Sequence, residues 1–173
     1  MPVVSDSYHH GDLRAALLRA ADDLLQEVGA EGVTLRAVAR KAGVSHAAPY
    51  RHFPSKEDLL AEIARVGFDR LRERLAAVRG EDSVRAAGAE YVRFAVEHPA
   101  RFDLMFGPYI TDYQRHPELG RSAAAAFAEL VEIIAAEQLE GRVAAGPAEA
   151  HATFAWSAVH GLATLLNLSL IHI

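Results

Sequence analysis

The sequence predicts an all-α protein in which an N-terminal three-helix helix-turn-helix domain precedes a C-terminal helical bundle. Three observations support this expectation. Residues 34–53 carry the start, stop and turn signals of two short helices. Apolar residues recur at helical spacing through the remaining sequence, and glycine or proline separates one such segment from the next.

Composition limits the possible classes of protein. The chain has 173 residues, 51% hydrophobic content and no cysteine. This length suits one or two small domains with an ample core, and the absence of thiols excludes a disulfide framework and a thiolate metal site. Residues 1–10 lack the basic and apolar regions of a secretory signal, so we expect a cytoplasmic protein.

The first helix is expected to begin after Asp12, which suits an N-cap, and to end at Gly29. A short arm formed by Tyr8, His9 and His10 precedes it. This arm, together with Arg14, has two equally acceptable interpretations: a contact with a nucleic-acid backbone, or an unstructured tail.

The segment Thr34–Phe53 has the pattern of helix, tight turn and helix. Thr34 suits an N-cap, and Gly43 follows the helical run where a left-handed residue is needed. Ser45 can cap a second short helix, and Ala39 is small enough for two helices to cross closely. The pattern therefore predicts a helix-turn-helix, with Phe53 in its core.

Positive charge is concentrated in this segment. Residues 32–56 include five basic side chains and no acidic one, whereas the whole chain has a formal net charge of −5. A surface that approaches phosphates needs such a bias, and an acidic remainder would orient that end toward DNA.

The residues that follow extend the pattern to a known family. Tyr50, His52 and Phe53, followed by Pro54–Glu57, closely resemble the DNA-binding domain of TetR-family transcriptional regulators. The resemblance implies a homodimer that binds a double-stranded DNA operator through residues 1–56. It also implies that residues 57–173 form a ligand-binding and dimerisation domain, reached through a linking helix that extends to about residue 79.

The position of each side chain suggests its role on DNA. The N-terminal turn of a recognition helix lies closest to base edges, whereas helix starts favour phosphate. The resemblance adds phosphate contacts from Tyr50 and His52. The expected DNA-contacting residues are Thr34, Arg36, Ser45, His46, Ala47, Tyr50, His52 and Lys56. Pro49 departs from the commoner family pattern, and we expect the helix to survive it with a tight start.

The linking helix should open with a capping box formed by Ser55 and Asp58 and continue to about Arg79. Its interleaved arginines and carboxylates are most simply a solvated face.

Aromatic residues gather between Tyr91 and Tyr113, which include half of the chain's phenylalanines and tyrosines. The residues alone favour an ordinary aromatic core, whereas the family resemblance favours a pocket for a small apolar or aromatic effector. The expected ligand-binding residues are Phe68, Phe94, Phe102, Met105, Phe106, Tyr109, Phe127, Trp156 and His160.

Two apolar helices are expected at the end, one opened by Pro117 and one by Pro147, and residues 150–173 contain no charged side chain. Length alone would permit a membrane span, but His151, His160 and Asn167 oppose it. Two such helices from each subunit suit a four-helix dimer interface, so no membrane association is expected.

Within the last helix, Trp156, His160 and Gly161 form the pattern W-x-x-x-H-G. It resembles the C-terminal ligand domain named for these residues in one TetR subfamily. His160 is either a satisfied core histidine or a ligand contact, and Gly161 indicates close helix approach or room for a ligand.

The segment 168–173, LSLIHI, ends without a cap signal. The same six residues would result from translating a sequencing adapter. We therefore expect the natural chain to continue differently from residue 168, with part of the dimer helix missing here.

No catalytic constellation, cofactor motif or metal motif is recognised, so no enzyme activity is expected. One hypothesis is a repressor that an effector releases from its operator. The alternative is a helical small-molecule-binding or membrane-associated protein without specific DNA binding.

Overall fold

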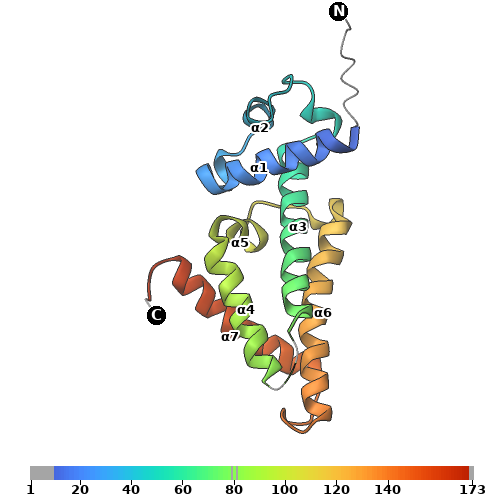
Figure 1. Ribbon diagram of the computed structural model, residues 1–173, viewed down its shortest axis with the longest axis vertical. Helices are drawn as coiled ribbons and strands as arrows, with labels where there is room; N and C mark the ends of the chain where they lie inside the picture. The colour runs from blue at the N-terminus through green and yellow to red at the C-terminus, as the bar shows by residue number, and fades with distance from the viewer. Residues whose placement is uncertain (1–9, 79, 81, 172–173) are drawn as a thin grey trace, which may run out of the picture.

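The computed structural model describes residues 10–78, 80 and 82–171, and these residues confirm the all-α prediction (Figure 1). They form seven α-helices and two short 3₁₀ helices. The elements are α1 (His10–Gly32), α2 (Leu35–Lys41), η1 (Pro49–Arg51), α3 (Lys56–Ala76), α4 (Ser83–Glu97), α5 (Pro99–Phe106), η2 (Tyr113–Arg115), α6 (Pro117–Leu139) and α7 (Ala148–Asn167).

One end of the molecule consists of α1, α2, η1 and the start of α3 (Figure 1). Leu17, Leu25 and Val38 are completely buried there, and Phe53 is buried with them, as predicted. Ala39 is also completely buried, so a larger side chain would separate the packed helices.

The end of α1 differs in detail from the prediction. Gly29 interrupts the regular helix with a positive φ of 67°, but the helix resumes after this kink and ends at Gly32. Tyr8 and His9 lie outside the described residues, whereas His10, which we expected in the arm, is the first residue of α1. Arg14 turns back onto the protein, where it pairs with Glu62 at 2.8 Å and lies over the Phe53 ring.

The long helix α3 leaves this end and continues into the second bundle (Figure 1). The predicted capping box is confirmed: the Ser55 amide donates to Asp58 Oδ2 at 2.9 Å, and the Asp58 amide donates to Ser55 Oγ at 3.1 Å. The helix ends at Ala76, slightly before the expected Arg79. In the second bundle α3 packs along α6, and α4 packs along α7.

The end of α7 carries a cap that the sequence did not predict. Ser169 adopts a left-handed φ of 55°, and its amide donates to the Leu166 carbonyl at 2.9 Å. The Leu170 amide donates to the Leu165 carbonyl at 3.0 Å. These two bonds form a Schellman motif, which usually uses glycine at the left-handed position.

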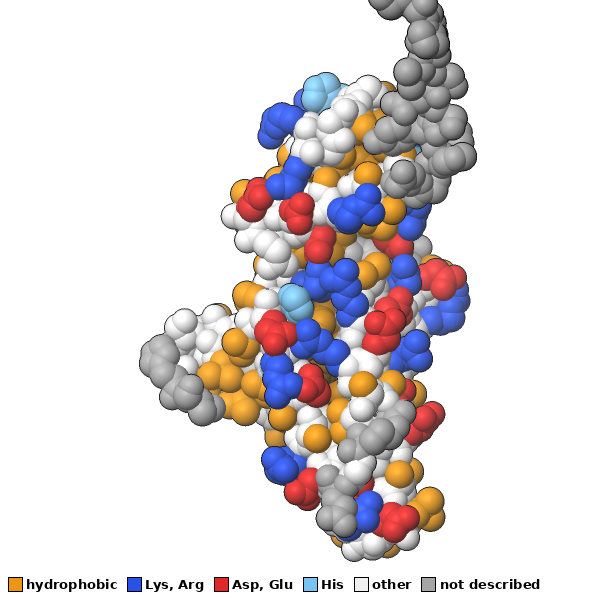
Figure 2. All heavy atoms as spheres, in the orientation of Figure 1, with side chains coloured by type: hydrophobic (Ala, Val, Ile, Leu, Met, Phe, Trp, Pro, Cys, Tyr) orange, Lys and Arg blue, Asp and Glu red, His pale blue; other side chains and the backbone are white. Residues whose placement is uncertain are grey.

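Apolar side chains are exposed near this end of α7, including Leu168 and Leu170 (Figure 2). Across the described part of the chain, no helix has both the length and the hydropathy needed to cross a lipid bilayer.

Candidate functional site

The turn between α2 and the following segment is built from local signals. Thr34 Oγ1 accepts a hydrogen bond from the Ala37 amide at 3.1 Å, which caps α2 as predicted. Gly43 has a φ of 69°, and the amides of Gly43 and Val44 donate to the carbonyls of Arg40 and Ala39. This Schellman motif ends α2 and turns the chain sharply.

The segment after the turn is not the α-helix capped by Ser45 that we expected. The Ala48 amide donates to the Ser45 carbonyl at 3.0 Å, and a single 3₁₀ turn, η1, follows. Pro49 explains the difference because it has no amide proton to donate to the Ser45 carbonyl. The segment expected to form the recognition helix therefore consists of two consecutive tight turns.

Most residues predicted to contact DNA are exposed at this end of the molecule. Tyr50 is 50% exposed, and His52 is partly buried beside Phe53. Basic and histidine side chains are visible at the tip formed by α2 and η1 (Figure 2). The other exposed residues of the predicted set are Thr34, Arg36, Ser45, His46 and Ala47.

Two lysines of the basic segment are committed to contacts within the protein. Lys56 Nζ donates to the Glu31 carbonyl at 2.7 Å, which ties the start of α3 to the end of α1. Lys41 Nζ lies 2.7 Å from Glu27 Oε1, and this hydrogen bond raises the pKa of Lys41. Arg36, Arg40 and Arg51 are exposed and are better placed to meet phosphates.

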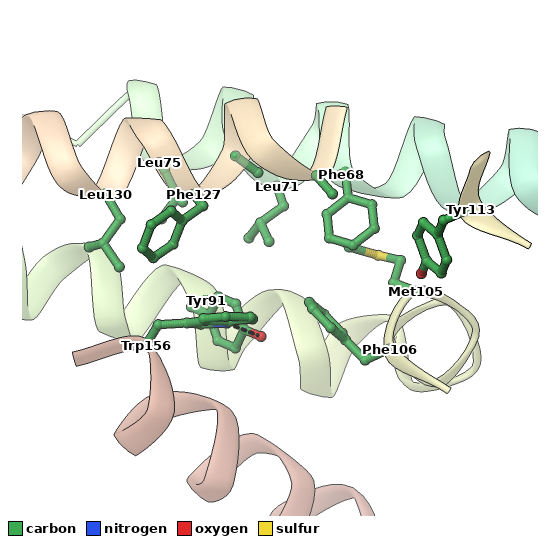
Figure 3. Close-up of a pocket in the computed structure, with 12 residues that line it drawn as sticks. Phe68, Leu71, Leu75, Tyr91, Met105, Phe106, Tyr113, Phe127, Leu130 and Trp156 are labelled. Carbon is green, nitrogen blue, oxygen red and sulfur yellow. Dashed lines mark hydrogen bonds between the residues drawn. The ribbon is translucent and has the colours of Figure 1, made fainter. Parts of the chain in front are cut away.

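A second candidate site is an apolar cavity of about 250 Å³ inside the other bundle (Figure 3). Helix α3 contributes Phe68, Leu71 and Leu75 to its wall. Opposite them lie side chains of α4, α5 and α7, and Tyr113 of η2 is 44% exposed at one end. The remaining lining residues are Tyr91, Met105, Phe106, Ala123, Ala126, Phe127, Leu130 and Trp156.

A chain of hydrogen bonds lies on one side of this cavity. Trp156 Nε1 donates to the Tyr91 hydroxyl at 3.1 Å (Figure 3). The same hydroxyl lies 2.8 Å from His160 Nδ1. Burial raises the pKa of Tyr91 and lowers the pKa of His160, so both groups are held neutral. The indole N–H donates to the Tyr91 oxygen, whereas the direction of the bond between Tyr91 and His160 follows the histidine tautomer: Tyr91 donates to Nδ1 when the imidazole proton is on Nε2, and accepts when that proton is on Nδ1.

The two sites occur together in one family of proteins. Residues 17–63 match the family model described as bacterial regulatory proteins of the tetR family. Residues 84–168 match the model described as the tetracyclin repressor-like C-terminal domain. This chain belongs to the TetR family.

Individual proteins are also similar to this TetR-family chain, and two of them are named as regulators or repressors. A solved structure from Rhodococcus sp. RHA1, described as a protein with unknown function, is 34% identical and has a TM-score of 0.81, with 96% of this chain and 88% of that chain covered. The HTH-type transcriptional regulator Rv1816 of Mycobacterium tuberculosis is 30% identical over 113 residues, which are 61% of this chain and 48% of the relative. The class A tetracycline repressor protein of Escherichia coli is 36% identical over 86 residues, with 50% and 36% covered. This chain thus spans less than half the length of these two named regulators.

Five residues of the predicted ligand set line the cavity of this TetR-family chain: Phe68, Met105, Phe106, Phe127 and Trp156.

The other four predicted ligand residues lie outside the cavity wall. Phe94 is completely buried in the core, and Tyr109 donates its hydroxyl proton to Asp103 Oδ2 at 2.6 Å, which raises the pKa of Tyr109 to about 12. Phe102 and His160 lie behind Phe106, and both border a separate depression between α5 and α7.

The sequence-based set missed several lining residues, among them Leu71, Leu75 and Tyr91. The first two continue the helical stripe that starts at Phe68, so spacing could have identified them. Tyr91 belongs to the aromatic cluster noted in the sequence. Its hydrogen bonds to α7 could not be predicted, because they depend on packing between segments that are distant in the sequence.

Helix α5 connects the cavity to the DNA-binding end of the TetR fold. Its residues Met105 and Phe106 line the cavity, while Arg101 on the same helix binds both carboxylate oxygens of Asp22 on α1. The Arg101 side chain is only 3% exposed. Its Nε and Nη1 atoms are buried without a hydrogen-bond partner among the described residues, so Asp22 is the main compensation for a buried charge.

The loop before α6 makes a second connection. Glu57, at the start of α3, accepts hydrogen bonds from the amides of Thr111 and Asp112 at 3.2 and 3.3 Å. His116 Nε2 lies 3.6 Å from the same carboxylate. Tyr113 lies in the sequence between Asp112 and His116, which both contact Glu57. These contacts therefore fix the exposed end of the cavity to the first turn of α3.

Proposed function

We propose that this TetR-family protein is a cytoplasmic, ligand-responsive transcriptional regulator, and most simply a repressor. Residues 1–56 bind a double-stranded operator, and residues 57–173 bind a small apolar or aromatic effector and dimerise. The observation that carries this proposal is the presence, on one continuous helix, of both sites: α3 starts beside the helix-turn-helix and ends along the apolar cavity. The pattern of Trp156, His160 and Gly161 supports membership of the W-x-x-x-H-G subfamily.

On DNA, the exposed turn after Gly43 enters the major groove. His46 is its one long polar side chain and can bond a purine edge, while Ala47 offers a methyl group to thymine. Arg36 and Tyr50 contact phosphates, which supply affinity without reading sequence. The shape of the DNA therefore contributes much of the specificity.

Effector control follows from the two connections between the ends. An effector in the cavity contacts Phe68 on α3 and Phe106 on α5, and Arg101 and Glu57 transmit any shift of these elements to α1 and to the start of α3. The effector releases DNA if it binds more tightly to a conformation with the wrong spacing of recognition elements. A difference of about 1–3 kcal/mol between conformations gives a 5- to 150-fold effect.

An unpartnered face of α7 supports a homodimer. Phe154 is 78% exposed and Leu165 is 41% exposed on one side of this helix, and Gly161 lies between them. A Cβ atom at Gly161 would meet nothing within 4 Å, so this glycine is not explained by packing inside the chain. A second copy that packs on this face would use the close approach that glycine allows.

Replacing Phe154 with glutamate is expected to weaken the dimer at least tenfold, because a charge would be buried without a partner. Sedimentation velocity over a concentration series measures this effect. Val28→Glu, at a 51% exposed position on α1, is the control and should leave the dimer unchanged. A monomeric wild-type protein, or a Phe154→Glu dimer of unchanged affinity, would contradict the assignment of this face.

DNA binding is tested by fluorescence anisotropy with the DNA upstream of the protein's own gene. We expect affinity to fall steeply with salt, and Arg36→Ala to weaken binding on the order of tenfold while reducing the salt slope by about one. Arg36 is a cleaner probe than Lys56 because Lys56 also holds the end of α1. Arg72→Ala, exposed on α3 away from the tip, is the matched control.

The alternative is a helical small-molecule-binding protein that does not use this end on DNA. It would be favoured by absent binding at low salt, or by equal losses in the Arg36→Ala and Arg72→Ala variants.

A further inference from the structure

The lining of the cavity restricts the chemistry of its occupant more narrowly than the word apolar does. None of the described lining residues carries a charge. A carboxylate, phosphate or ammonium group placed there would lose its hydration without gaining an ion pair, which is strongly unfavourable. Charged effectors are therefore excluded from the cavity.

Size gives a second restriction. An apolar cavity of about 150 Å³ accommodates benzene. The cavity here has a volume of about 250 Å³, which by proportion suits a ligand of about ten non-hydrogen atoms. Two fused aromatic rings have this size, and the rings of Phe68, Phe106 and Trp156 offer faces and edges for them to pack against.

The polar atoms give a third restriction. The Trp156 N–H is committed to the Tyr91 oxygen. We assign His160 the tautomer with its proton on Nε2, in which Nδ1 accepts the Tyr91 proton. The Tyr91 oxygen keeps one unused lone pair, so it can accept another hydrogen bond but has no further proton to give. Tyr113 can donate, but it is 44% exposed and water competes for its hydroxyl.

We propose that the cavity selects a neutral two-ring aromatic compound, such as a naphthol-like or indole-like molecule, that donates one hydrogen bond to the Tyr91 hydroxyl oxygen. The proposal rests on the proposed function in taking this cavity as the effector site. The Tyr91 hydroxyl lies beside the Trp156 indole on the α4 side of the cavity (Figure 3), where a ligand packed against Phe106 would meet it.

Four probes of similar shape test this selection by isothermal titration calorimetry with the full chain near neutral pH. They are 2-naphthol, which donates, 2-methoxynaphthalene, which only accepts, naphthalene, which does neither, and the 2-naphthoate anion. We expect 2-naphthol to bind about fivefold more tightly than 2-methoxynaphthalene or naphthalene, and 2-naphthoate not to bind measurably. Equal affinities for the first three probes, a preference for the methyl ether, or tight binding of the anion would overturn the proposal.

Two variants locate the effect. Tyr91→Phe removes the acceptor and frees the Trp156 N–H to donate, so the preference for 2-naphthol over 2-methoxynaphthalene should fall to about one while naphthalene still binds. Ala123→Leu fills the cavity and should abolish binding of every probe, whereas Ala77→Leu, exposed at the end of α3, should not. An unchanged naphthol preference in Tyr91→Phe, or unchanged binding in Ala123→Leu, would refute the assignment to this cavity.

The calorimetry with the four probes tests the ligand class, and the anisotropy assay tests the regulatory function, so a negative result in one experiment can be distinguished from a negative result in the other. Salt-dependent DNA binding without the predicted order of probes removes the ligand class and leaves the regulator in place. The predicted order of probes in a protein that does not bind DNA supports the cavity assignment and removes the regulatory function.

Discussion

Replacing Asp22 with asparagine is expected to lower the free energy of unfolding by about 3 kcal/mol, the largest single effect that we predict. The substitution preserves shape but leaves the buried Arg101 guanidinium without an anion. The expected loss is at the low end for a broken buried ion pair because the Asp22 side chain is 28% exposed. Thermal or denaturant unfolding at fixed protein concentration measures it, with a fall in Tm of roughly 6–12 °C.

The neighbouring Asp23→Asn variant is the matched control, since Asp23 is exposed and should contribute little. The double variant Asp22→Leu with Arg101→Met removes both charges and should recover much of the lost stability. If Asp22→Asn unfolds at the same point as Asp23→Asn, the ion pair does not hold α5 against α1 as we describe.

Gly67→Val is expected to lower the free energy of unfolding by about 2 kcal/mol and to occlude the cavity. A Cβ atom at position 67 would lie 2.6 Å from Met105 Sδ and 3.2 Å from Arg101 Cδ. Met105 can move, but the cavity is the space beside it. Denaturant unfolding gives the stability change, and calorimetry with 2-naphthol gives the loss of binding.

Gly120→Val on α6 provides the comparison, because a Cβ atom there would meet nothing within 4 Å. Its stability should stay the same or rise slightly, since glycine is a poor helix former. Similar losses in both variants would show that the close approach of α3 and α5 at Gly67 has no special role.

The parts of the fold that the sequence predicted correctly depend on local signals. Thr34, Gly43 and the pair Ser55 and Asp58 act on backbone groups within four residues of themselves. Such caps can be identified without knowledge of the tertiary structure.

The incorrect details arose where one local signal opposed another. Ser45 suggested a helix start, but Pro49 removed the first hydrogen bond that an α-helix needs there. At the end of α7, Ser169 took the left-handed conformation without being glycine or asparagine, which residue preferences alone do not predict.

The candidate site could be predicted only in part because its geometry depends on distant segments. Phe68 and Phe106 were in the expected ligand-binding set because the family resemblance favoured a pocket, but the spaces between helices decide which aromatic side chains face a cavity. Phe94 and Phe102 have the same character and yet pack into the core. Likewise, nothing local to Asp22 indicates that Arg101 will lie against it.

The connection between the cavity and the DNA-binding end is the central claim, and a single measurement tests it directly. Anisotropy of the labelled upstream DNA is recorded with and without 2-naphthol at a concentration that calorimetry shows to be saturating. We predict that the Kd for DNA rises at least fivefold for the wild-type protein and stays constant for Ala123→Leu. An unchanged Kd in the saturated wild-type protein would contradict the account, because occupation of the cavity would then not control DNA binding.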